Sequence, residues 1–188
     1  FDGLSIRHEV TEHIRSPPLY ARVMGTRFEQ LPPAVRAMHE TRRDGGASGV
    51  AEVTGSRNLL TGAIASLIGF PRAGTHELHV AFEERDGVET WIRTFSGKRF
   101  HSRLSQDGRW LVERFGAFRF GFELPSDEHG LAMVMRRWWI GPLRLPLALA
   151  PRSLAREWEE DGRFHFDVPI ALPVLGRIVH YRGRLEAR

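Results

Sequence analysis

The sequence contains no cysteine, which excludes disulfide bonds, thiol catalysis and cysteine metal sites within it. Lysine is almost absent as well, because Lys98 is the only lysine among the 27 basic residues. The isoelectric point of about 10.5 reflects the high pKa of arginine, since the formal net charge is only +4. No uninterrupted apolar run reaches the ~18 residues that span a bilayer. We therefore expect no transmembrane segment.

Known cofactor and metal motifs are also missing. The sequence has no GxGxxG between a strand and a helix and no GxxxxGK[ST], so no nucleotide cofactor is expected. His76 and His79 are three residues apart on a predicted strand, where they point to opposite faces and cannot bind one metal ion. The arginines are spread along the chain between glutamates, unlike the clustered basic face of a nucleic-acid-binding protein. We predict no cofactor, no metal site and no nucleic-acid partner.

The length of 188 residues is typical of one domain, with enough chain to bury a core that has room for a cavity. Residues 1–16 are charged, have few apolar positions and precede two prolines, so we predict a tail or linker remnant there. Residues 17–188 are predicted to form a single α+β domain. Apolar residues at helical spacing predict short helices between residues 19 and 38 and again between 58 and 70. The glycine-rich residues 42–49 are predicted to form a loop.

After Pro71 the apolar residues alternate, which predicts strands joined by tight turns. A two-residue turn fixes which residues of two strands face each other. Phe82 is predicted to face Trp91, Arg93 to face Phe100, and Glu113 to face Ser102. The turns from which these pairs follow are Asp86-Gly87, Ser96-Gly97 and Asp107-Gly108, and Asp161-Gly162 predicts a further hairpin. All four strands of this meander then share one apolar face, which carries Leu78, Val80, Phe82, Trp91, Phe95, Phe100, Leu104, Leu111 and Phe115.

The side-chain pattern changes face at Gly116-Ala117, which a β-bulge and a further tight turn explain equally well. The later strands bring the predicted total to about eight. We therefore predict an α+β fold in which a strongly bent antiparallel sheet forms a half-barrel or open barrel. Two or three short helices are expected against its concave face. By analogy alone, this outline is similar to lipocalin-like and helix-grip folds that bind hydrophobic ligands.

Two charged residues fall on the predicted apolar face. Arg93 lies between Val80 and Phe100, and Glu113 lies two strands away, about 10 Å across the sheet. One interpretation is a charged pair that lines an aromatic cavity for a small molecule. The other is a structural ion pair that fills the core, because a buried charge needs a partner. The predicted ligand-binding residues are this pair, the aromatic residues around it and two further inward charges: Phe82, Trp91, Arg93, Phe100, Glu113, Phe115, Arg137 and Glu157.

Several short motifs resemble one bacterial family when they are taken in order. They are Leu19-Tyr20-Ala21-Arg22-Val23, Leu31-Pro32-Pro33-Ala34-Val35-Arg36, Glu113-Arg114-Phe115-Gly116, Arg136-Arg137-Trp138, Leu149-Ala150-Pro151-Arg152-Ser153, Glu159-Glu160-Asp161-Gly162-Arg163-Phe164 and His180-Tyr181-Arg182-Gly183. Together they resemble the family catalogued as domain of unknown function 4166, over roughly residues 17–186. The resemblance implies a bacterial, cytoplasmic protein that works beside an adjacent dehydrogenase-like or epimerase-like domain. It implies no activity and no catalytic residues.

The leading hypothesis is a non-enzymatic module that binds an apolar or lipid-like small molecule with a polar head group. Arg93 and Glu113 would orient the head group. The apolar segment 143–149 is either a lid over the cavity or ordinary core packing. The alternative from another class is a small enzyme in which Glu113, its pKa raised by burial, is the general acid or base on a hydrophobic substrate. A third hypothesis is a structural partner domain of a nucleotide-binding oxidoreductase, with a solid core and no cavity.

Overall fold

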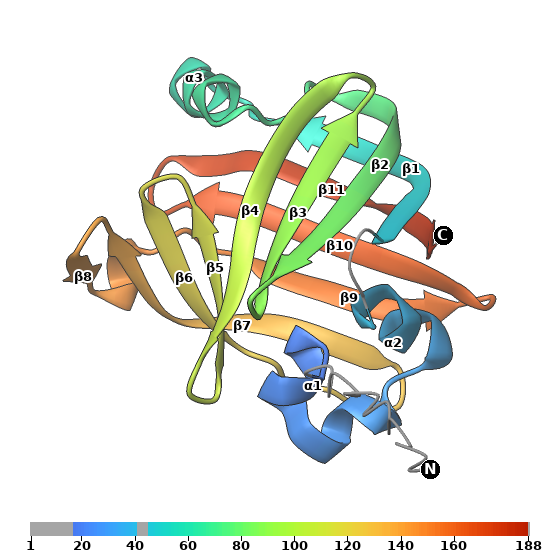
Figure 1. The fold of residues 1–188 in the computed structure, drawn as a ribbon. Helices are drawn as coiled ribbons and strands as arrows, with labels where there is room; N and C mark the ends of the chain where they lie inside the picture. Colours follow the sequence, from blue (N-terminus) through green and yellow to red (C-terminus); the bar gives the residue numbers. More distant parts are fainter. Residues whose placement is uncertain (1–16, 41–44, 188) are drawn as a thin grey trace, which may run out of the picture.

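The computed structural model describes residues 17–40 and 45–187 (Figure 1). The predicted tail, residues 1–16, lies outside the described residues. The helical segments are α1 (Leu19–Met24), the 3-10 helix η1 (Gly25–Gln30), α2 (Pro33–His39), α3 (Leu59–Ile68) and the short 3-10 helix η2 (Leu147–Leu149). The strands are β1 (Gly45–Gly55), β2 (Gly74–Arg85), β3 (Val88–Phe95), β4 (Lys98–Asp107), β5 (Trp110–Phe115), β6 (Phe118–Glu123), β7 (Gly130–Ile140), β8 (Leu143–Leu145), β9 (Leu154–Glu160), β10 (Arg163–Leu172) and β11 (Gly176–Ala187).

The strands form one antiparallel sheet that closes on itself. Their order is β6-β5-β4-β3-β2-β1-β11-β10-β9-β7-β8, and an additional pairing of β6 with β7 closes a barrel of ten strands, with β8 added beside β7. The α+β class and the antiparallel sheet are therefore confirmed. The prediction of about eight strands in a half-barrel or open barrel is wrong. Hairpin turns identify only neighbours along the chain, whereas the closed barrel also needs the pairings of β1 with β11 and of β7 with β9, which no hairpin turn joins.

Strand β1 begins within the segment that we predicted to be a loop. Residues 45–49 belong to β1, because Gly45 to Gly49 pair with Phe82 to Leu78 of β2. The composition of this segment favours a loop, since glycine is a weak strand former. The two neighbouring strands override this local preference by supplying hydrogen-bond partners on both sides.

Three of the four predicted hairpin turns are confirmed. Asp86-Gly87, Ser96-Gly97 and Asp161-Gly162 have positive φ at both positions, as a type I′ turn requires. Phe82 accordingly faces Trp91, and Arg93 faces Phe100.

The turn between β4 and β5 differs from its prediction. Asp107 pairs with Trp110, so the two turn residues are Gly108 and Arg109 and not Asp107 and Gly108. Glu113 therefore faces Leu104 and not Ser102. Because the register moves by an even number of residues, every side chain keeps its predicted face. At the next turn, Phe115 pairs with Phe118, so Gly116-Ala117 forms a tight turn and not a bulge.

The helices lie at the two ends of the barrel (Figure 1). The N-terminal group, α1, η1 and α2, packs one end, where α1 contacts β4 and β5 and α2 contacts β9, β10 and β11. Pro33 begins α2 at its first position, where a missing N–H is tolerated. Helix α3 lies at the other end. The apolar residues that this N-terminal cap buries are Leu19, Tyr20, Val23, Met24, Phe28, Leu31, Val35 and Met38.

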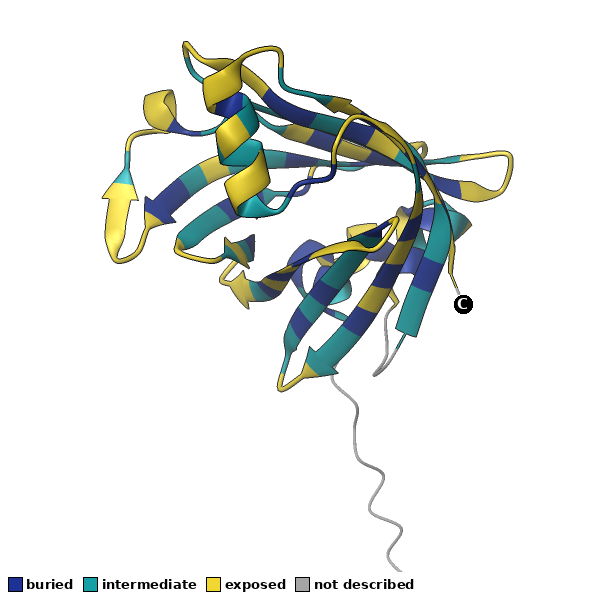
Figure 2. Ribbon diagram, turned by 90° about the horizontal axis from the view of Figure 1, so that it is seen from above, coloured by how far each residue is buried: buried dark blue, intermediate teal, exposed yellow. Residues whose placement is uncertain are grey.

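Along the strands, buried and exposed residues alternate over much of the barrel wall (Figure 2). This alternation places a nearly continuous apolar surface inside. None of the described helices has both the length and the apolar character needed to cross a membrane.

Candidate functional site

A cavity of about 480 Å³ lies inside the barrel. Its wall is mostly apolar and comes from β2 to β7 on one side, from β9 to β11 on the other, and from α3 at one end. The polar side chains in the wall are few, namely those of Tyr20, Arg93, Glu113, Ser153, Glu157 and Tyr181. This is the usual composition of a small-molecule pocket, in which a few polar groups orient an otherwise apolar ligand.

Six of the eight predicted ligand-binding residues line this cavity: Trp91, Arg93, Phe100, Glu113, Phe115 and Glu157. Phe82 does not. It is buried in the core and packs edge-to-face on Trp91, with 4.7 Å between the ring centroids. Phe82 thus supports the cavity wall from behind.

Arg137 lies on the outer face of the barrel, contrary to the inward orientation that simple alternation along β7 predicts. The register between β6 and β7 shifts between Gly121 and Phe122, so that Gly121 faces Arg137 but Phe122 faces Met135. This bulge reverses the alternation after Met135. The Arg137 guanidinium is 2.9 Å from Asp107 Oδ2 and lies over the ring of Trp110, 5.0 Å from its centroid.

Arg93 and Glu113 meet across the cavity wall. Arg93 Nη2 is 3.7 Å from Glu113 Oε1, and Arg93 Nη1 donates a hydrogen bond of 2.9 Å to Ser102 Oγ. The guanidinium also lies over two aromatic rings, 5.1 Å from the centroid of Trp91 and 5.7 Å from that of Phe100. These contacts hold the charge at a fixed position, with the Glu113 carboxylate balancing it.

A second polar pair joins the wall to the N-terminal cap. Glu157 of β9 lines the cavity, and its Oε2 is 2.6 Å from Nε2 of His39, whose side chain is fully buried. The His39 ring stacks on Tyr20 with 3.6 Å between the ring centroids. The Trp91 ring centroid is 5.6 Å from that of His39, with an angle of 25° between the two ring planes. His39 Nδ1 is buried without a hydrogen-bond partner in the part of the chain that the structure describes. The pair therefore links one charged residue of the cavity to the helix that packs the end of the barrel.

Two tyrosine side chains, those of Tyr20 and Tyr181, reach the same cavity. Within residues 17–40 and 45–187, neither phenol hydroxyl hydrogen-bonds to another residue. Burial, together with the negative charge of Glu157, raises the pKa of Tyr20 well above its ordinary value. Burial likewise raises the pKa of Tyr181 to about 12, against the lowering effect of Arg93. Both phenols are thus held neutral, and each can donate a hydrogen bond to a molecule in the cavity.

The buried tyrosines lead to a spectroscopic prediction, because they are the only two in the sequence. The folded protein should show almost no phenolate absorbance at pH 10, which is the ordinary pKa of tyrosine. In the urea-unfolded chain, the phenolate transition of both tyrosines should be centred near that pH. Unfolding then releases protons above pH 10, so the free energy of unfolding should fall as the pH rises toward about 12. A half-complete phenolate transition near pH 10 in the folded protein would contradict the burial of one of the two.

Glu89 is a further buried acid, next to the cavity wall. It accepts hydrogen bonds from Trp91 Nε1 (3.1 Å) and from the backbone N–H of Leu19 (3.3 Å). Burial raises the pKa of its carboxyl group, and these hydrogen bonds oppose that rise. Glu89 thus fixes the indole of Trp91 in the wall and ties the first residue of α1 to β3.

Four of these residues were not predicted from the sequence. Glu89 is on the same face of its strand as Trp91 and Arg93, and Tyr181 is on the same face as the buried Val179 and Leu185. Strand alternation alone was therefore enough to predict that both side chains point inward. Tyr20 and His39 gave no comparable signal, because their roles depend on how the helices pack on the barrel. Among the described residues, no group of three or more His, Asp or Glu could hold a metal ion.

A family model described as "Domain of unknown function (DUF4166)" matches residues 31–185. No curated protein matches the chain. The matched range includes α2, α3, β1 to β10 and most of β11, and therefore nearly the whole cavity wall.

Proposed function

We propose that this protein, which belongs to the DUF4166 family of domains of unknown function, binds an apolar or lipid-like small molecule in its barrel. The observation that carries the proposal is the cavity of about 480 Å³ with an almost entirely apolar wall. This volume is within the range of roughly 300–1,000 Å³ typical of small-molecule sites. The cavity argues against the alternative of a solid structural domain.

The polar groups of the wall favour a neutral head group with a hydroxyl or carbonyl oxygen. Arg93 is balanced by Glu113, and Glu157 adds a second acidic side chain to the same wall. An anionic head group would therefore meet a guanidinium already paired with Glu113 and a Glu157 side chain already paired with His39, so among the described residues of the wall no positive charge is left free to bind it. The hydroxyls of Tyr20 and Tyr181 have no partner among the described residues and can bond a neutral oxygen.

The test combines mass determination with a defined probe. Native mass spectrometry of protein purified without detergent should show a discrete excess mass, and organic extraction should identify its class. A fluorescent long-chain alcohol should bind the emptied protein more tightly than the corresponding carboxylic acid. The absence of both an excess mass and alcohol binding would contradict the proposal, whereas conversion of the extracted molecule would favour the enzyme alternative with Glu113 as acid or base.

The role of the cavity ion pair can be measured with a double variant. Replacing Arg93 and Glu113 together by leucine should weaken binding of the alcohol probe about tenfold, equivalent to one or two hydrogen bonds. The fold should tolerate the change, because a buried ion pair can be replaced by apolar residues of similar size. Arg136→Leu with Glu123→Leu is the matched control, since this pair is half-exposed and 2.8 Å apart. If the cavity variant keeps both stability and probe affinity, the assignment of Arg93 and Glu113 to the site is wrong.

Two further aspects of the proposal come from the family resemblance alone. They are a cytoplasmic location in a bacterium and an adjacent dehydrogenase-like or epimerase-like domain as partner. A binding module beside such a domain would hold an apolar molecule out of water while the neighbouring domain modifies it.

A further inference from the structure

Three segments that are distant in the sequence line the cavity at the end away from the N-terminal cap (Figure 1), and we call them the mouth surface. They are residues 56–74 with α3, residues 140–155 with β8 and η2, and residues 168–179 at the turn between β10 and β11. Each contributes to the cavity wall, for example through Ile64, Ser153 and Ile170. All three lie on the same side of the molecule, on the left in Figures 1 and 2.

Hydrogen bonds hold these segments together. Asn58 Nδ2 donates to the carbonyl oxygen of Leu175 at 2.9 Å. Arg152 and Ala171 exchange two backbone hydrogen bonds of 2.7 and 3.0 Å. The mouth surface is therefore one continuous surface.

Large apolar side chains are exposed on all three segments. Helix α3 contains no charged residue, yet Leu59 is 95% and Leu67 is 89% exposed. A helix that is apolar on every side normally lies in a core or against a membrane, and clustered apolar exposure indicates an interaction site. Segment 143–149, predicted to be a lid or core packing, is exposed too. The exposed apolar residues of the mouth surface are Leu59, Leu60, Leu67, Ile140, Leu143, Leu147, Leu149, Leu154, Val174 and Leu175.

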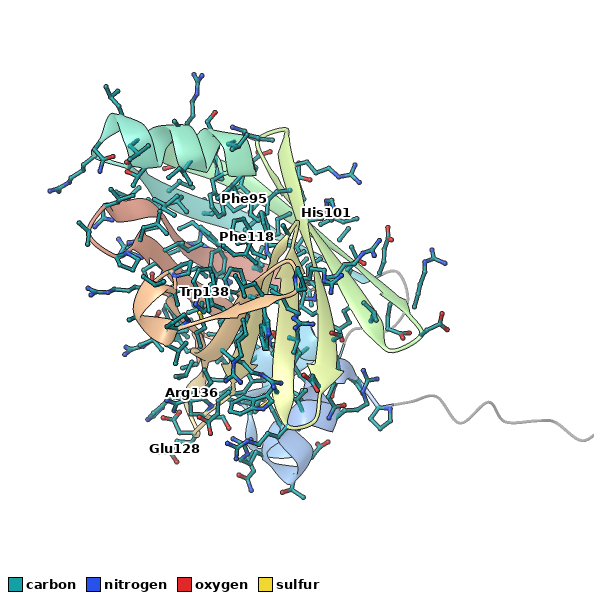
Figure 3. All side chains as sticks on the ribbon, turned by 90° about the vertical axis from the view of Figure 1, so that its left-hand side faces the viewer. Phe95, His101, Phe118, Glu128, Arg136 and Trp138 are labelled. Carbon is teal, nitrogen blue, oxygen red and sulfur yellow. The ribbon has the colours of Figure 1, made fainter. Side chains whose placement is uncertain are left out.

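The charges of the mouth surface have one sign. None of its three segments contains Asp or Glu, although the chain has 23 acidic residues. The arginines are all exposed, and none forms an ion pair with another described residue. Figure 3 looks onto this side, with Phe118 and Trp138 below α3 and the acidic Glu128 at the end away from α3. The exposed arginines of the mouth surface are Arg57, Arg72, Arg144, Arg152 and Arg177.

We propose that the mouth surface docks onto an anionic lipid bilayer, so that the apolar ligand passes between the bilayer and the cavity without crossing water. This inference rests on the proposed function. Exposed leucines and an uncharged helix suit the boundary between head groups and acyl chains, and the unpaired arginines suit phosphate groups. A second copy of this chain is a poorer occupant, because it would bring five further unpaired arginines against the first five.

Cosedimentation with vesicles tests the docking. The protein should bind vesicles of phosphatidylcholine with phosphatidylglycerol at least tenfold more tightly than vesicles of phosphatidylcholine alone, and salt should weaken the binding. Leu59→Gln with Leu60→Gln should reduce binding about tenfold, and so should Arg144→Gln with Arg152→Gln. The matched controls are Val50→Gln for the exposed apolar residues and Arg99→Gln with Arg103→Gln for the exposed arginines. These three residues lie on β1 and β4, outside the mouth surface.

Binding of the fluorescent alcohol in buffer without vesicles separates the two proposals. The leucine and arginine variants should retain wild-type probe affinity, because none of the four substituted residues lines the cavity. A protein that binds the probe but neither kind of vesicle would overturn the docking proposal and leave the proposed function intact. A wild-type dimer that the leucine substitutions dissociate would also overturn it, by assigning the mouth surface to a second copy.

Discussion

Replacing Gly183 with alanine is expected to lower the free energy of unfolding by roughly 3 kcal/mol, at the upper end for overpacking. A Cβ atom at this position would lie 2.1 Å from the carbonyl oxygen of Val50 and 2.9 Å from Cα of Ala51. Both atoms belong to the backbone of β1, which pairs with β11 along nine residues of each strand. Since a backbone cannot move aside as the end of a side chain can, the substitution must separate the two strands.

Chemical denaturation of the wild-type protein and the variant measures this effect. Gly62→Ala is the matched control, because the nearest atom to its added Cβ is 4.0 Å away and Gly62 lies within α3. The control should be stabilised by about 0.5–1 kcal/mol through the higher helix propensity of alanine. Equal stabilities of the Gly183 variant and the wild-type protein would mean that β1 and β11 do not approach as closely as described.

Replacing His39 with phenylalanine is expected to destabilise the protein by roughly 3 kcal/mol, because it leaves the Glu157 carboxylate without its partner. Phenylalanine retains the stack on Tyr20, so the loss reports mainly on the contact between His39 Nε2 and Glu157 Oε2. Adding Glu157→Leu to this variant should restore much of the stability, since two apolar side chains then replace the polar pair. The double-mutant cycle gives the coupling energy directly.

The control for this cycle is His165→Phe. His165 also packs on an aromatic ring, that of Trp158, and also pairs with a glutamate, Glu160, at 3.8 Å. Because Glu160 is largely exposed, the control should change the stability by less than about 1 kcal/mol. Losses of the same small size in both variants would show that water in the cavity solvates Glu157 and that the His39 contact does not stabilise the cap.

The two ends of the barrel differ in a way that suits the two proposed roles. The N-terminal cap is held by specific polar contacts, including a 2.7 Å hydrogen bond from the Ala34 N–H to Glu159 and the contact of His39 with Glu157. The opposite end has exposed leucines, with no acidic residue in its three segments. One end is therefore fixed and polar where a head group would lie, and the other is apolar where a ligand would enter.

The sequence by itself determined the local structure of the meander. Period-two alternation and positive-φ turn residues depend only on neighbours along the chain, so they predicted the pairing of Phe82 with Trp91 and of Arg93 with Phe100. They also predicted the face on which Glu113 lies, even though its partner across the sheet proved to be Leu104. An even shift of register changes partners without changing faces.

Only the tertiary structure decided the closure of the barrel and what lies at each end. The closure depends on the pairings of β1 with β11 and of β7 with β9, which no hairpin turn joins. The bulge that turns Arg137 outward arises where β7 pairs with β6. The stack of Tyr20 on His39 depends on how the cap packs. The mouth surface has the same origin, since its three acid-free segments are dispersed in a sequence whose charges look evenly mixed. Contacts between distant segments form because they bury shared apolar surface. The sequence pattern within one segment shows which of its faces is buried, but it does not identify the segment that covers that face.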